Sequence, residues 1–175
     1  MLPRLAAFVD TVRIVATAST PLSRTGFYDR MQRVQRGAFT AEFLTPEELE
    51  QRDRGRTSEI LSGSRFVRLL QSGGARSRVI LTGRGGCPMN IVIDGQAIQR
   101  TLEETATTGA PSSIMSSGSA RRYSEDVLSI DELLDGRAIM AIEIYPSGTN
   151  APAEITPPSG RGACGIVVIW TGARR

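Results

Sequence analysis

Short apolar runs, separated by polar and turn-forming residues, recur along this chain and predict a β-sheet. Gly73-Gly74 and Asp94-Gly95 provide turns after two of these runs. A period-two alternation over residues 10–16 predicts a further strand near the N-terminus. The other predicted strands are the apolar, largely β-branched stretches at residues 66–70, 78–82, 89–93, 139–145 and 165–171.

Helical periodicity and capping signals predict short helices between these strands. Residues 27–35 carry their apolar side chains on one face, which is typical of an amphipathic helix. Thr45 precedes a proline and is followed three residues later by Glu48, so we expect a capping box and a helix from 46 to about 53. A further helix is predicted over 130–134. Helices inserted among the strands of one sheet predict a compact α+β domain with a mixed sheet.

The length of 175 residues and the apolar content of 40% are sufficient for the core of one domain. We expect residues 1–25 to form an N-terminal strand and linker, and residues 26–175 to form the α+β domain. Residues 103–126 are small and polar and predict a long loop, as do the Pro- and Gly-rich residues 146–162. No export signal is evident, because charged residues interrupt the apolar stretch near the N-terminus.

Composition restricts the chemistry that this chain can perform. All 21 basic residues are arginine, and the sequence contains neither lysine nor histidine. Imidazole bases, imidazole metal sites, Schiff-base chemistry and phosphate-binding lysines are therefore excluded. The two cysteines are too far apart for a CxxC zinc or redox motif. We therefore predict no enzymatic activity, no cofactor and no metal site.

The carboxylates and the glycine-rich segment are also predicted to be structural. Residues 83–86 (GRGG) lack the Gly-Lys-Ser/Thr ending of a phosphate loop and lead into a strand, so no phosphate site is expected. For the acidic residues nearest the strands, turn and surface roles are favoured over metal binding or acid–base catalysis. These residues are Asp94, Asp131, Glu132, Asp135 and Glu143.

The net charge of +3 and the pI near 9.4 arise from scattered arginines. Few aromatic residues accompany them, so a nucleic-acid partner is not expected. One interpretation is a basic docking face for another protein, with the lone tryptophan as an interface anchor; the other is a solvated surface with the tryptophan in the core. The candidate contact residues are Arg30, Arg33, Arg36, Arg52, Arg54, Arg56 and Trp170.

Cys87 and Cys164 each stand just before an apolar strand. Their thiols would be well placed to meet if these two strands were neighbours in one sheet. The residues alone leave two interpretations open, which are buried free thiols and a disulfide.

Several of these segments, in their order along the chain, resemble the plug domain of TonB-dependent outer-membrane receptors. Residues 90–95 (NIVIDG) look like the "plvvIDG" strand of the plug. Residues 139–148 (IMAIEIYPSG) resemble its "sIEVlkGp" segment, and residues 162–171 (GACGIVVIWT) resemble its closing "GvIvIxT" strand. The usual Pro-Gly-Val turn is replaced by residues 62–66 (SGSRF), and no barrel sequence follows. The resemblance therefore predicts a free-standing, plug-like domain.

The resemblance implies a location in the periplasm or cell envelope of a Gram-negative-type bacterium. In such an oxidising compartment, Cys87 and Cys164 are expected to form a disulfide. The implied function is that of a non-enzymatic structural or accessory subunit, which binds protein subunits of a larger membrane complex and does not itself span the membrane. No small-molecule substrate is indicated. The alternative is the plug, or gate, of a TonB-dependent outer-membrane transporter.

Overall fold

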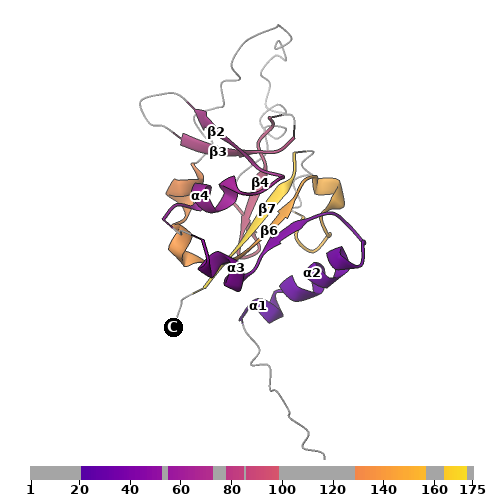
Figure 1. Cartoon of the computed structure of the whole chain (residues 1–175). Helices are drawn as coiled ribbons and strands as arrows, with labels where there is room; N and C mark the ends of the chain where they lie inside the picture. The colour runs from indigo at the N-terminus through magenta and orange to yellow at the C-terminus, as the bar shows by residue number, and fades with distance from the viewer. Residues whose placement is uncertain are drawn as a thin grey trace, which may run out of the picture.

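The strands form two sheets, of which the larger is mixed and has the order β1-β6-β7-β4-β5 (Figure 1). The smaller sheet is the antiparallel β2-β3 hairpin. The predicted α+β class is confirmed. The strand predicted over residues 10–16 and the loop predicted over residues 103–126 lie outside the described part of the chain. The computed structural model describes residues 21–52, 55–72, 78–84, 86–98, 129–156 and 164–172.

The five strands predicted between residues 66 and 171 are confirmed, each to within two residues at either end. The strands of the main sheet are β1 (Glu42–Leu44), β4 (Asn90–Ile93), β5 (Gln96–Ala97), β6 (Ile139–Tyr145) and β7 (Ile166–Thr171). The hairpin consists of β2 (Arg68–Ser72) and β3 (Arg78–Thr82). The Asp94-Gly95 turn between β4 and β5 is also confirmed, with φ values of 49° and 82°.

The helices are α1 (Pro21–Arg24), α2 (Phe27–Gln35), α3 (Pro46–Glu50), α4 (Thr57–Ser62) and α6 (Ile130–Leu133), with 3-10 turns η1 (Gly136–Ala138) and η2 (Gly148–Asn150). The predicted capping box is confirmed, because the Thr45 hydroxyl accepts from the Glu48 N–H and the Glu48 carboxylate accepts from the Thr45 N–H. The helix ends at Glu50, three residues earlier than predicted. No described helix has both the length and the apolar character needed to cross a membrane.

The main sheet is buried on both faces, which explains why its central strands are almost continuously apolar. Ile142 and Ile144 of β6 pack in a core with residues of α3, α4 and α6. Ala141 and Tyr145, which alternate with them, pack in a second core with residues of α1 and α2. Helices therefore cover the two faces separately, and α2 lies on the opposite side of the sheet from α3 and α4 (Figure 1).

The predicted disulfide is confirmed: Cys87 is bonded to Cys164, and their Cα atoms lie 5.5 Å apart. The register of the sheet explains the pairing. Strands β4 and β7 are parallel neighbours in which Asn90 lies opposite Ile166, so both strands begin at the same end of the sheet. The cysteines precede these first paired residues by three and two positions, respectively. The bond therefore joins the entries of two adjacent strands.

Candidate functional site

The most unusual group of side chains in the described structure surrounds Glu143, in the middle of β6. Glu143 is fully buried, and its carboxylate accepts from three side chains. Arg30 donates to it from Nε at 2.8 Å and from Nη2 at 2.6 Å. The Tyr145 hydroxyl donates at 2.7 Å, and the Trp170 indole N–H donates at 2.6 Å. We call Arg30, Glu143, Tyr145 and Trp170 the Glu143 cluster.

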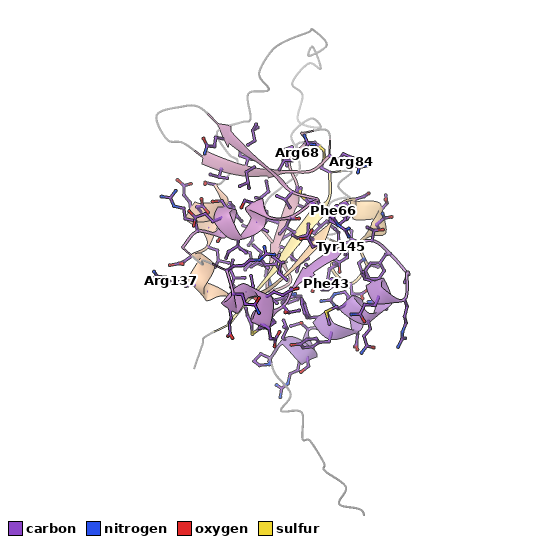
Figure 2. The ribbon with its side chains drawn as sticks, in the orientation of Figure 1. Phe43, Phe66, Arg68, Arg84, Arg137 and Tyr145 are labelled. Atoms are coloured by element: carbon purple, nitrogen blue, oxygen red, sulfur yellow. A yellow bond between two sulfur atoms is a disulfide. The ribbon has the colours of Figure 1, made fainter. Side chains whose placement is uncertain are left out.

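The alternation of side chains along the strands and the spacing of residues along α2 bring the cluster together on the face of the sheet that α2 covers. Glu143 and Tyr145 are two residues apart on β6, so their side chains point to the same side. Trp170 lies on the adjacent strand β7, where it is paired with Ala141. Arg30 lies three residues after the fully buried Phe27 on the inner face of α2. Figure 2 shows Tyr145 beside the central strands, above α2.

Charge neutralisation stabilises the cluster in the interior. Burial alone would lower the pKa of the Arg30 guanidinium, but its hydrogen bonds and charge attraction to Glu143 outweigh this effect and raise the pKa. Burial raises the pKa of the Tyr145 phenol, and the negative charge of Glu143 raises it further. Arg30 therefore stays charged and Tyr145 stays protonated, and both hold the Glu143 carboxylate.

The two oxygens of Glu143 receive four hydrogen bonds, which is about the full accepting capacity of a carboxylate. A third hydrogen bond of Arg30, from Nη1 to the Thr25 carbonyl at 2.8 Å, ties the same side chain to the turn before α2. The cluster therefore fastens α2 to the sheet. Both oxygens of Glu143 are occupied by donors of the protein itself.

The sequence-based interpretation of Glu143 as a surface residue is wrong. An acidic residue between isoleucines is typical of a strand with one solvated face, but α2 covers this face of β6 and buries the side chain. Arg30 is also wrongly assigned to a docking face, since it is only 3% exposed. Trp170 lies in the core at 8% exposure, as in the alternative interpretation. The sequence signal for this burial was a single glutamate within an otherwise continuous apolar run, which is the pattern of a strand that is buried on both faces.

The remaining predicted contact residues do not form one basic face. Arg33 of α2 and Arg36, which directly follows this helix, are exposed. Arg56 is exposed and Arg52 half-buried beside α4, on the other side of the sheet. Arg52 donates to the Ile60 carbonyl at 3.0 Å. Arg54 lies outside the described residues. A role for the exposed arginines in partner contact stays a prediction.

Arg33 borders a surface hollow of about 360 Å³ between the end of α2 and η2. It forms an exposed ion pair with Glu154, and its guanidinium lies 5.5 Å from the centre of the Phe39 ring. Burial tends to raise the pKa of the Glu154 carboxyl, but a backbone hydrogen bond and Arg33 outweigh it and lower the pKa. Since Arg33 and Glu154 already satisfy each other, the hollow offers no unpaired charge to a ligand.

Two of the remaining predicted carboxylates connect separate elements. Asp94 accepts from the N–H and hydroxyl of Thr171 and so joins the β4-β5 turn to β7. Asp131 of α6 accepts from the N–H and hydroxyl of Ser58 at the start of α4.

The other two predicted carboxylates stay near the surface. Asp135 caps η1 through the Arg137 N–H, and Glu132 is exposed. Among the described residues, no three His, Cys, Asp or Glu side chains are grouped to hold a metal.

The described structure thus contains the Glu143 cluster, which joins α2 to the sheet, and a disulfide that joins two adjacent strands. Comparison of the sequence with models of known protein families, and with curated protein sequences, finds no match to this chain.

Proposed function

We propose that this protein is a plug-like periplasmic module without catalytic activity, which acts as a structural or accessory protein-binding subunit of a larger bacterial membrane complex. One observation carries the proposal. The three segments that resemble plug strands are β4, β6 and β7, and they are adjacent in one sheet in the order β6-β7-β4. Local similarity of apolar strands would not require these three segments to pair with one another.

The disulfide supports the proposed compartment. Disulfides persist in oxidising compartments and are rare in the reducing cytosol. The Cys87–Cys164 bond is therefore compatible with an extracytoplasmic location. Together with the resemblance of β4, β6 and β7 to plug segments, it supports the proposed periplasmic location.

The contacts of the carboxylates within the protein favour a binding role over catalysis. The buried carboxylate of Glu143 is committed to Arg30, Tyr145 and Trp170. The carboxylates of Asp94 and Asp131 hold neighbouring elements together. Such groups stabilise a scaffold, and a stable scaffold presents its surface residues to a partner.

Mild-detergent extraction of native membranes, followed by affinity purification of the tagged, full-length chain, tests the function. We expect stoichiometric co-purification with envelope proteins that survives gel filtration at 150 mM salt. Cells alkylated before lysis should show both cysteines already oxidised. Recovery only as a free monomer would contradict the subunit proposal, and reduced cysteines would contradict the compartment. Recovery with an outer-membrane receptor would favour the alternative, in which the domain gates transport.

A further inference from the structure

Among the residues that the structure describes, the β2-β3 hairpin has one closed edge and one open edge. Along β3, the Val79 N–H donates to the Ser129 hydroxyl at 3.1 Å, and the Leu81 carbonyl accepts from the Met89 N–H at 2.9 Å. These contacts close the edge of β3 that faces away from β2. On the other edge, β2 pairs with no strand except β3 among the described residues.

The register identifies the backbone groups that the open edge presents. Residues of an antiparallel pair alternate between facing the partner strand and facing away from it. Val79 and Leu81 use their backbone groups on the far side, so their partners Gln71 and Leu69 also face away from the hairpin. The N–H and C=O groups of Leu69 and Gln71 therefore point outward, and no described residue pairs with them.

The side chains at this edge are also available for contact. Leu69 and Leu70 are 36% and 38% exposed, and they are two of the three large apolar side chains exposed among the described residues. As neighbours on a strand, they lie on opposite faces of the ribbon. Arg68 is exposed at the start of the same strand, and Figure 2 places it at the hairpin end of the molecule together with Arg84.

The charge of the region around the hairpin indicates which kind of partner can bind at this edge. Residues 60–93, which include the hairpin, contain five arginines and neither aspartate nor glutamate. In the rest of the chain, the other 16 arginines are outnumbered by the 18 acidic residues. Pairing two copies through β2 would bring two strongly basic hairpins together, which costs free energy through like-charge repulsion. An acidic partner would instead be attracted to the basic hairpin.

We propose that the outer edge of β2 is a docking site for an extended, acidic segment of a partner protein, which adds to the hairpin as a third strand. The outward groups of Leu69 and Gln71 would supply backbone hydrogen bonds, as in other cases of strand addition. Leu70 would contact an apolar residue of the partner segment. Arg68 lies on the same face of β2 and would contact an acidic residue of the segment two positions away from the apolar one. This inference rests on the proposed protein-binding function and identifies its contact surface.

The test uses the full-length, oxidised, ¹⁵N-labelled protein and a capped peptide, Glu-Thr-Thr-Val-Val-Glu. Its antiparallel register places the second threonine opposite Gln71 and the second valine opposite Leu69. NMR titration should give the largest amide shifts at Leu69 and Gln71, with slower hydrogen exchange of both amides. A control peptide, N-methylated at the second threonine and second valine, keeps charge and composition but loses two donors. We expect it to bind about tenfold more weakly.

Protein variants test the charge and the edge separately. Arg68→Glu should weaken peptide binding about threefold or more and should favour a peptide with lysine at both ends. Arg24→Glu is the matched control, since it makes the same charge change on an exposed residue of α1 and should have less effect. Gln71→Pro removes an outward N–H that makes no bond to β3, so it should abolish binding while the hairpin stays folded.

Three results would overturn the proposal. Equal binding of the N-methylated peptide would exclude strand addition. Stronger binding of phosphatidylglycerol vesicles than of the peptide, abolished by Arg68→Glu, would assign the surface to a membrane. A dimer in sedimentation that Gln71→Pro dissociates would assign the edge to a second copy. If Gln71→Pro captures the native partner as well as wild type does, the protein-binding function stands and only the β2 site fails.

Discussion

Removing either member of the Arg30–Glu143 pair should destabilise the fold strongly, whereas replacing both should not. Arg30→Met leaves a carboxylate with 0% exposure and only two of its four hydrogen bonds. Glu143→Gln leaves a guanidinium with 3% exposure facing a neutral amide. Because an unpaired charge in the interior keeps its full desolvation cost, we expect each single change to cost about 3–5 kcal/mol.

The double variant Arg30→Met/Glu143→Gln removes both charges together. The new amide can accept from the Trp170 indole and donate to the Tyr145 hydroxyl, so no buried charge remains. We expect the pair of changes to cost about 2 kcal/mol, which is less than either change alone. The coupling energy of the cycle should therefore amount to several kcal/mol.

Guanidinium chloride unfolding of the four proteins at pH 7, followed by tryptophan fluorescence and circular dichroism, measures this coupling. The matched control is the exposed pair of Arg33 and Glu154, whose side chains are 44% and 48% exposed. Arg33→Gln and Glu154→Gln should each cost no more than about 1 kcal/mol, because solvent screens this pair. Additive costs at Arg30 and Glu143, with coupling below about 0.5 kcal/mol, would refute the reasoning.

Replacing Cys87 and Cys164 together by serine should lower the free energy of unfolding by about 4.5 kcal/mol in the chain-entropy model, since the bond closes a loop across 77 residues. Reductant should bring the wild type to the same unfolding midpoint, and a cost below about 1 kcal/mol would contradict this estimate. Because the pKa of Tyr145 is raised in the fold, the unfolded state loses this proton first as the pH rises above about 10, and stability falls with a slope of up to about 1.4 kcal/mol per pH unit. Tyr145→Phe should lack this contribution, and identical slopes between pH 10 and 11 would argue against it. Gly165→Ala should cost at least about 2 kcal/mol more than Gly37→Ala, which thermal unfolding can compare. Both glycines have positive φ, but at Gly165 a Cβ would lie 2.5 Å from a carbonyl oxygen, whereas Gly37 is open.

The local elements of this protein were largely predictable from the sequence. The capping box at Thr45 and the turn at Asp94 depend on contacts within a few residues, so their signals are complete in the local sequence. The central strands were equally evident, because burial on both faces requires continuous apolar runs. Strand β1, with three residues, is too short to carry a period and was not predicted.

Only the tertiary structure decided which residues these elements bring together. The sequence showed two cysteines before two strands, but the parallel register of β4 and β7 made them neighbours. It also showed Arg30 as one of several helical arginines and Glu143 as one of several carboxylates. Their 113-residue separation contains no local signal of contact. The packing of α2 against β6 buries them together, and burial turns an ordinary acid and base into an ion pair that holds the fold.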